Sequence, residues 1–364
     1  MQTKFEKLAE RFAPVQEDNI RFLNYAVTNL CNSKCTTCNI WQLYRPGAYD
    51  LGKDVFLSEI KAEDIRKAFT ASKCFSSIKN VNLTGGEPFL KKDFVEIILT
   101  FHEMFPTANF NITSNGLETD YTVKKLKELA AHSIFPNITF SVDGMEHEHD
   151  RVRGVEGGYT KTMNTILLVK KEIPQLKMAL SFTINPTNYK ELPKVFTKSK
   201  ELGIAFITRY ALVNPGFYYN NDMPLNWEPE ALQETHNMLM QIKKEKNEHV
   251  NPFVGVFSAE KYFFNNMTKQ LDVPKRTYEC FSGTNGFFMD PYGNVKSCYI
   301  LEQVFGNIKK QSFDELWFSE NAKKARAFIA ARKCNCWTEC DTIPSLEKNN
   351  LMVIKDNLAD ALHL

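Results

Sequence analysis

Three cysteines within eight residues, Cys31, Cys35 and Cys38, are the residues of this chain whose types and spacing most clearly point to chemistry. They follow the pattern Cys-x3-Cys-x2-Cys. Three thiolates cannot all pair with one another, and a closed zinc site needs four nitrogen or sulfur ligands. The next cysteine, Cys74, lies far along the chain beside the apolar Phe75, a setting that predicts a buried structural thiol. The spacing therefore predicts a loop that holds three corners of an iron–sulfur cube and leaves the fourth iron open.

Three short polar motifs follow the cysteines, each at the end of a strand-like segment. They are 84–88 (TGGEP), 114–116 (SNG) and 141–144 (SVDG), the last followed by Arg151 and Arg153. Parallel α/β folds bind their ligands at the carboxyl ends of strands. Paired glycines let the backbone approach a ligand, and an arginine can grip a carboxylate with two hydrogen bonds. These motifs predict a ligand site, with ordinary surface charge the alternative for Arg151 and Arg153, above all for Arg151.

The cysteine triplet and these motifs, in this order, resemble the signatures of the radical S-adenosylmethionine (SAM) superfamily. The resemblance implies a [4Fe–4S] cluster on Cys31, Cys35 and Cys38, whose open iron binds the amine and carboxylate of SAM. It also implies SAM contacts from Gly85, Gly86, Glu87, Ser114, Asn115, Ser141, Asp143 and Arg153. The chain departs from the family at Thr37, where an aromatic residue usually packs near the adenine; Trp41 and Ile40 are the candidates to supply that contact.

Strand-like and helix-like segments alternate from residue 21 to residue 212. The expected strands are Arg21–Asn29, Ile78–Gly85, Asn109–Asn115, Asn137–Asp143, Ala179–Asn185 and Ile204–Ala211. Helical segments such as Lys92–Phe105 and Val123–Ala131 lie between them, which favours parallel strands joined by crossover helices. Six units are fewer than the eight of a closed barrel. We therefore expect an open, partial (β/α)6 TIM-like barrel, the fold that the resemblance also implies.

Polar and apolar residues alternate within these expected strands. In one of them, Asn80, Asn82 and Thr84 alternate with Val81 and Leu83. Successive side chains of a strand point to opposite faces of the sheet. The apolar face must pack against the helices, so the polar face should line the inside, where dry burial of so many polar groups would be costly. The pattern predicts a polar-lined cavity that holds a polar ligand.

Five cysteines fall late in the chain, and the segment around them predicts a small module. Residues 287–289 and 295–299 flank a turn and predict a β-hairpin, and the pair Ser312 and Glu315 forms a capping box that opens a helix. From Cys280 to Cys298 the pattern is Cys-x12-Gly-x4-Cys. It resembles the first half of the SPASM/twitch modules that bind auxiliary [4Fe–4S] clusters in radical SAM enzymes.

The module has enough cysteines for one auxiliary cluster with one to spare. The expected ligands are Cys280, Cys298, Cys340 and either Cys336 or Cys334, since a one-residue spacer makes it difficult for the last two to bind one cube. A four-cysteine zinc site is the alternative.

Composition bounds the remaining properties. A net charge of +2 over 364 residues gives no reason to expect nucleic acid or an anionic membrane as partner, and no apolar run is long enough to span a bilayer. Residues 1–12 are charged and amphipathic, unlike a signal peptide. Nine cysteines in such a chain favour metal binding in a reducing cytoplasm. The expected divisions are residues 1–20, a barrel core at 21–212, a substrate-facing linker at 213–279, the cluster module at 280–345 and a tail at 346–364.

The resemblance implies the following activity. An external one-electron donor of the flavodoxin or ferredoxin type reduces the cluster, SAM is cleaved to a 5′-deoxyadenosyl radical, and the radical abstracts a hydrogen atom from the substrate. An auxiliary cluster that accepts the remaining electron makes the reaction a net oxidation, hence a radical SAM oxidoreductase. We expect a small molecule such as a sugar or an aminocyclitol, because about twenty residues before the first strand leave no room for a peptide-recognition domain. The alternatives are a peptide-modifying maturase and a non-catalytic zinc-binding interaction protein.

Overall fold

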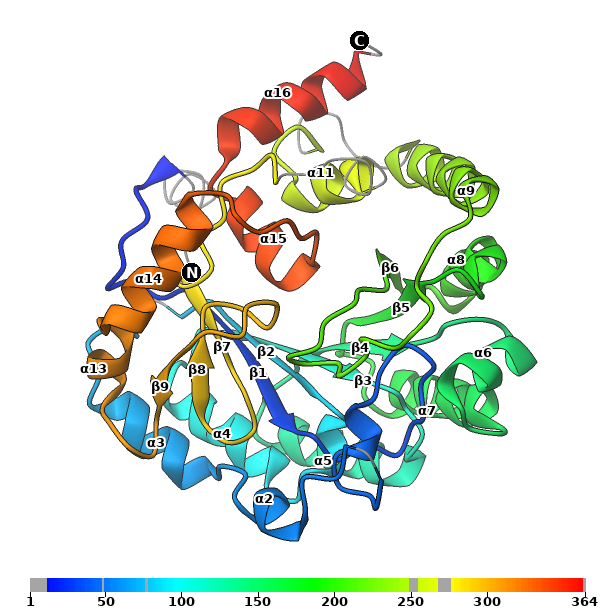
Figure 1. Cartoon of the computed structure of the whole chain (residues 1–364). Helices are drawn as coiled ribbons and strands as arrows, with labels where there is room; N and C mark the ends of the chain where they lie inside the picture. The colour runs from blue at the N-terminus through cyan, green and yellow to red at the C-terminus, as the bar shows by residue number, and fades with distance from the viewer. Residues whose placement is uncertain (1–11, 48, 76–77, 249–254, 268–275, 363–364) are drawn as a thin grey trace.

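The computed structural model describes residues 12–47, 49–75, 78–248, 255–267 and 276–362, and it is built on one nine-stranded sheet (Figure 1). Six strands run parallel in the order in which they occur along the chain: β1 (Phe22–Thr28), β2 (Asn80–Gly85), β3 (Asn109–Ser114), β4 (Asn137–Ser141), β5 (Met178–Ile184) and β6 (Ala205–Tyr210). All six expected strands are present, each within two residues of its expected limits at either end. The strand order places β6 at one edge of the sheet and β9 at the other, so the barrel is open, as predicted.

Helices cover the outer face of the parallel strands. They are α3 (Ala62–Thr70), α4 (Phe94–Met104), α5 (Thr119–Ala131), α6 (Glu146–Arg153), α7 (Gly158–Glu172) and α8 (Leu192–Leu202), with the short α2 (Lys53–Leu57) and the 3-10 turns η1 (Ile40–Gln42), η2 (Pro88–Leu90) and η3 (Tyr189–Glu191) between elements. The apolar residues of the strands, such as Val81, Leu83 and Ile138, are fully buried against these helices. Their burial turns the alternate, polar residues to the inner face.

The C-terminal module continues the same sheet. Strand β7 (Gly286–Met289) pairs in parallel with β1, and β8 (Asn294–Lys296) and β9 (Val304–Asn307) follow antiparallel. The expected hairpin is therefore confirmed, although β8 ends earlier than expected. At Gly286 a Cβ atom would lie 2.4 Å from the ring of Phe22, so a side chain there would push the two strands apart.

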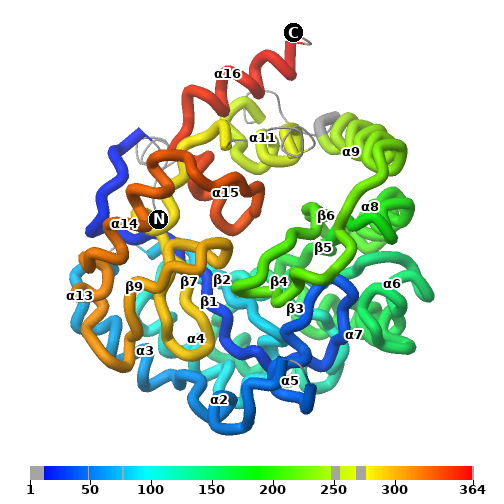
Figure 2. Tube along the Cα trace, in the orientation of Figure 1, coloured from blue at the N-terminus to red at the C-terminus, as the bar shows by residue number. Residues whose placement is uncertain are grey.

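Five further helices complete the described chain around the module: α13 (Phe313–Trp317), α14 (Glu320–Ala330), α15 (Glu339–Leu346), α16 (Asn350–Ala361) and α11 (Ala259–Asn266). The predicted capping box opens α13, since the Ser312 side chain accepts from the Glu315 N–H and the Glu315 carboxylate accepts from the Ser312 N–H. Helix α9 (Pro229–Glu248) follows β6, and α15 lies between the two edges of the sheet (Figures 1 and 2). None of the described helices is both long enough and apolar enough to cross a membrane.

Candidate functional site

A row of asparagine amides crosses the inner face of the sheet. Asn137 Nδ2 donates to Asn111 Oδ1 at 2.7 Å, Asn111 Nδ2 to Asn82 Oδ1 at 2.8 Å, and Asn82 Nδ2 to Asn24 Oδ1 at 2.7 Å. The four residues occupy paired positions on neighbouring strands, so the parallel register stacks their amides. Each amide keeps a second N–H and a second lone pair for other partners. The inner face is thus polar without leaving its amides unpaired.

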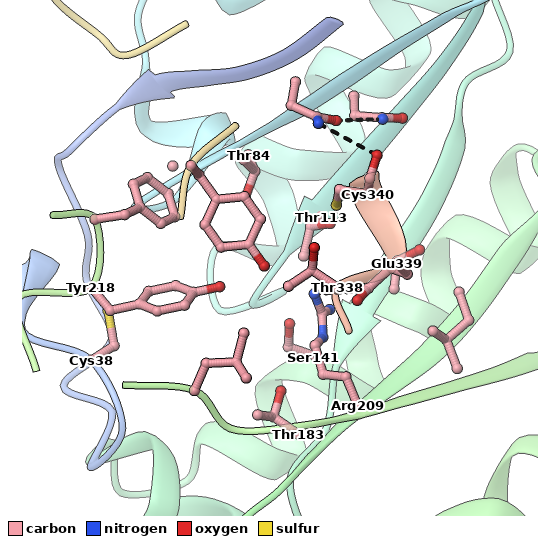
Figure 3. Close-up of a pocket in the computed structure, with 18 of the residues that line it drawn as sticks. Cys38, Thr84, Thr113, Ser141, Thr183, Arg209, Tyr218, Thr338, Glu339 and Cys340 are labelled. Atoms are coloured by element: carbon pink, nitrogen blue, oxygen red, sulfur yellow. Dashed lines mark hydrogen bonds and ion pairs between the residues drawn. The ribbon is translucent and has the colours of Figure 1, made fainter. Parts of the chain in front are cut away.

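This amide row borders a cavity of about 580 Å³, a volume typical of small-molecule sites. The cysteine loop at residues 29–39 closes one side, and the chain after β6 together with α15 closes the other. Figure 3 shows Thr84, Thr113 and Ser141 on the strand side, with Tyr218 and Glu339 on other walls. The polar-lined cavity predicted from the alternation is therefore present.

The three clustered cysteines all line this cavity. Burial, followed by the charge of neighbouring Cys35, raises the pKa of Cys31 to about 12 and also raises the pKa of Cys38. The three sulfurs therefore lie close together in a poorly solvated place. Thiols in such surroundings become thiolates readily only beside positive charge, which a metal centre supplies.

The glycine pair of the second motif packs directly on the cysteine loop. Gly86 N donates to Thr28 O at 2.7 Å, and Glu87 N donates to Leu30 O at 2.8 Å. A Cβ atom on Gly86 would lie 2.3 Å from Leu30 O, and one on Gly85 would lie equally close to Thr28 O. Both glycines also line the cavity. Their lack of a side chain thus allows both the close packing against the cysteine loop and the approach of a ligand.

Glu87, which we expected to contact the SAM ammonium, does not line the cavity. Its buried carboxylate accepts hydrogen bonds from Asn115 N at 2.7 Å, Ser114 Oγ at 3.0 Å and Phe89 N at 3.2 Å. Burial raises the pKa of Glu87 to about 7. Glu87 therefore lies behind Ser114 and Asn115 and holds both through hydrogen bonds, and these two residues line the cavity.

The last motif brings a buried ion pair to the cysteine loop. Arg153 Nε lies 2.9 Å from Asp143 Oδ2, and Arg153 Nη1 donates to Cys35 Sγ at 3.4 Å. Both residues and Ser141 line the cavity, as do Thr37, Ile40 and Trp41. Arg151 instead lies on the surface, bound to Glu148 and Thr187, so the surface-charge alternative holds for that residue.

Four of the late cysteines lie near one another. Burial, then the charges of Cys280 and Asp341, raise the pKa of Cys336 to about 12, with Cys334 a further contributor. Burial, then Asp341, Cys336 and Cys280, raise the pKa of Cys298. Cys334 and Cys336 therefore both lie within electrostatic range of Cys280, and the choice between them as cluster ligand stays a prediction.

Cys340, one of the expected ligands of the auxiliary cluster, lines the cavity. It packs against the apolar cluster that contains Phe288 and Tyr299. Burial and the charge of Glu339 are the main causes that raise the pKa of Cys340. Cys340 belongs to the first turn of α15, and the direction of that helix sets where its side chain points.

Sequence reasoning missed a cavity-lining ion pair opposite the cysteine loop. Arg209 of β6 meets Glu339 of α15, with Nη1 2.5 Å from Oε1, and Arg209 Nη2 donates to Ser181 Oγ at 3.0 Å. Glu339 Oε2 is buried without a hydrogen-bond partner among the described residues. The sequence did contain a sign that these two residues belong to the site, since Arg209 is the single charged residue in its expected strand and Glu339 directly precedes Cys340.

Family models decide the assignment. The model of the radical SAM superfamily matches residues 25–198, and that of an iron–sulfur cluster-binding domain, SPASM, matches residues 280–341. The chain belongs to the radical SAM superfamily. It is a radical SAM enzyme with a C-terminal SPASM-type module, and the match gives no support to a zinc-binding interaction protein.

Similar proteins include enzymes with different named substrates. The sporulation killing factor maturation protein SkfB of Bacillus subtilis (strain 168) is 31% identical over 188 residues, which cover 50% of this chain and 40% of SkfB. Fe-coproporphyrin III synthase of Methanosarcina barkeri is 25% identical over 333 residues, covering 86% of this chain and 77% of the synthase. This chain therefore spans less than half the length of SkfB.

Solved structures share the fold. Streptococcus suis SuiB bound to precursor peptide SuiA has a TM-score of 0.60 at 14% identity, covering 89% of this chain and 70% of SuiB. The structure of anSMEcpe with bound AdoMet has a TM-score of 0.59 at 16% identity, covering 94% of this chain and 98% of anSMEcpe.

The donor groups fit the cofactors of such an enzyme, a SAM-binding [4Fe–4S] cluster, SAM and auxiliary iron–sulfur. Three partly buried cysteines line the cavity, and their number suits a cluster with one open iron. The second group of four thiols lies in the module. The radical SAM enzyme thus carries one set of cysteines at the polar cavity and a second set in its C-terminal module.

Proposed function

We propose that this radical SAM enzyme oxidises a small polar molecule, such as a sugar or an aminocyclitol, by net removal of two hydrogens. The observation that carries the proposal is the amide row of Asn24, Asn82, Asn111 and Asn137, whose remaining N–H groups and lone pairs border the cavity. Hydroxyl and amino groups pair with such amides, whereas an apolar ligand would leave them without partners.

We propose the following positions for the cofactors. Cys31, Cys35 and Cys38 hold the SAM-binding cluster, and Cys280, Cys298, Cys334 and Cys336 hold the auxiliary cluster. The residues that border SAM are Gly85, Gly86, Ser114, Asn115, Ser141 and Asp143. When bound, the cofactors supply the 5′-deoxyadenosyl radical, which abstracts hydrogen, and an acceptor for the second electron. An external donor of the flavodoxin or ferredoxin type supplies the first electron.

The protein's own residues orient the substrate and receive its proton. The amide row holds substrate hydroxyls, which fixes the carbon that faces the cysteine loop. On the opposite wall Glu339 Oε2 is unpaired, so this carboxylate is placed to accept a hydroxyl or ammonium proton. Arg209 holds the Glu339 carboxylate in place through their ion pair, and the hydrogen bond from Arg209 Nη2 to Ser181 Oγ orients the guanidinium in turn.

The experiment uses anaerobically reconstituted protein with SAM, a reductant and a panel of sugars and aminocyclitols deuterated at carbon. The expected result is 5′-deoxyadenosine that contains substrate deuterium, formed one for one with a product two hydrogens lighter. Release of 5′-deoxyadenosine without deuterium transfer from any member of the panel would count against the proposal.

Peptide modification is the second candidate. It is favoured by the similarity to SkfB, named as a maturation protein, and by the shared fold with SuiB, solved with its precursor peptide. The same assay separates the two functions when peptides are added to the panel. Deuterium transfer from peptides alone would establish the second candidate.

A further inference from the structure

Arg153 holds a position that its expected contact with SAM does not explain. It ends α6, its side chain is only 13% exposed, and its guanidinium contacts both Asp143 and the sulfur of Cys35. The guanidinium therefore reaches one of the three loop cysteines directly. Burial of an arginine beside a thiol has a cost that must be offset by a paired charge, and Asp143 provides that charge.

The protein backbone fixes this arrangement independently of the arginine side chain. Lys34 N donates to Arg153 O and Thr36 N donates to Val152 O, both at 2.8 Å, so the end of α6 is docked on the cysteine loop. At Gly154, with φ of 63°, a Cβ atom would lie 2.4 Å from Lys34 O. Substitution of the Arg153 side chain leaves these contacts in place.

Asp143 is held equally firmly on the other side of the arginine. Its Oδ1 accepts from Thr183 N at 2.8 Å, its backbone N–H donates to His149 Nδ1 at 3.3 Å, and its carbonyl accepts from Asn188 Nδ2 at 3.1 Å. The ion pair is thus a fixed element, with little freedom to turn its guanidinium away from Cys35.

We propose that Arg153 is a positioning residue that donates a hydrogen bond to the Cys35 sulfur and thereby makes the SAM-binding cluster easier to reduce. Reduction adds negative charge to the cluster, and a hydrogen bond from a cation to a ligand sulfur strengthens as that charge grows. Hydrogen bonds to the sulfurs and net charge are the protein's means of setting a cluster potential. Asp143 offsets part of the arginine's charge, so removing each partner should shift the potential in opposite directions. This inference concerns the entry of the first electron and does not depend on which substrate is oxidised.

The test is a potentiometric titration of the reconstituted full-length protein without SAM, followed by electron paramagnetic resonance. The signal of the SAM-binding cluster is recognised by its change when SAM is added. In Arg153→Gln/Asp143→Asn both charges are removed together, so the effect isolates the hydrogen bond. We expect the ratio of reduced to oxidised cluster at a fixed potential to fall about tenfold, equal to about 59 mV for one electron. In Asp143→Asn alone the ratio should rise.

Arg151→Gln is the matched control, because Arg151 lies on the same helix but is bound to Glu148 and Thr187 at the surface. Its cluster potential should equal that of the native protein. A double variant with a native potential but weakened SAM binding would overturn the inference, since Arg153 would then serve SAM alone. If the double variant takes up no iron, Arg153→Lys and Asp143→Asn decide the question: the lysine cannot keep both contacts, and native potentials in these two variants would also refute the role.

Discussion

Gly86→Ala should disable SAM cleavage by displacing the cysteine loop. The added Cβ would lie 2.3 Å from Leu30 O, 2.7 Å from Leu30 C and 2.9 Å from Asn29 O. These are backbone atoms, so no change of rotamer relieves the contact. Atoms of this kind pack no closer than about 3.5 Å, and the loop must therefore move by roughly 1 Å. Leu30 immediately precedes Cys31, which moves with it.

The expected loss of stability combines the overpacking at Gly86 with the two hydrogen bonds that the displacement weakens. Overpacking costs about 1–3 kcal/mol. The hydrogen bonds from Gly86 N to Thr28 O and from Glu87 N to Leu30 O are each worth roughly 0.5–1.5 kcal/mol. The free energy of unfolding should therefore fall by about 2–6 kcal/mol, within the total stability of an ordinary domain. A 1 Å displacement of a reacting group can cost about a hundredfold in rate, which sets the expected loss of SAM cleavage.

Two measurements test this reasoning, denaturant unfolding and the rate of 5′-deoxyadenosine formation at matched iron content. Gly157→Ala is the control, because Gly157 has a φ of 67° but a Cβ atom added there would have no other atom within 4 Å. That variant should lose about 1–2 kcal/mol from backbone strain alone and keep native cleavage. Native stability and native cleavage in Gly86→Ala would refute the argument that the glycine holds the loop.

Three further predictions concern the charged and sulfur groups. Replacing all three loop cysteines by alanine should abolish SAM cleavage and lower iron from about eight to about four atoms per chain, as counted by iron and sulfide analysis. Glu87→Gln should remove a pH dependence of stability. Burial raises the pKa of Glu87 from 4.5 to about 7, so the free energy of unfolding of the native apoprotein should fall by roughly 3 kcal/mol as the pH rises from about 4.5 to 7. Urea unfolding of the native protein and the variant at both ends of that pH range measures the difference. Cys298→Ala should spare 5′-deoxyadenosine formation but stop product formation and lower the iron content, whereas Cys340→Ala should keep the full iron content. Equal loss of iron in both variants would show that Cys340 is also a ligand of the auxiliary cluster.

The strands and their polar face were predictable because strand alternation is a local signal. The alternation of Asn80, Asn82 and Thr84 with Val81 and Leu83 needs no knowledge of neighbouring strands. The amide row was not predictable, since it depends on the register that places Asn82 beside Asn24 and Asn111. Pairing of β7 with β1 was missed for the same reason, because parallel pairing of distant segments leaves no local mark.

The positions of Cys340 and Glu87 show a second limit of the sequence. Spacing identifies residues able to bind a cluster or a ligand, but the direction of each side chain depends on the element that carries it. Cys340 belongs to the first turn of α15 and faces the cavity, while Cys334 and Cys336 precede that helix. Glu87 turns away from the cavity because the N–H groups of Phe89 and Asn115 need an acceptor behind the wall.

Helix α15 links the cavity to the sulfur groups of the module through neighbouring residues. Glu339 and Cys340 line the cavity, while Asp341, the next residue, is among the charges that act on Cys298 and Cys336. In the proposed oxidation the proton and the second electron would leave the substrate toward the same element. Proton and electron transfer are both favoured when the acceptor groups lie at short and fixed distances from the substrate, and a flexibly tethered module would not hold them there. The parallel pairing of β7 with β1, together with the close contact of Gly286 and Phe22, fixes the module to the barrel and so meets that requirement.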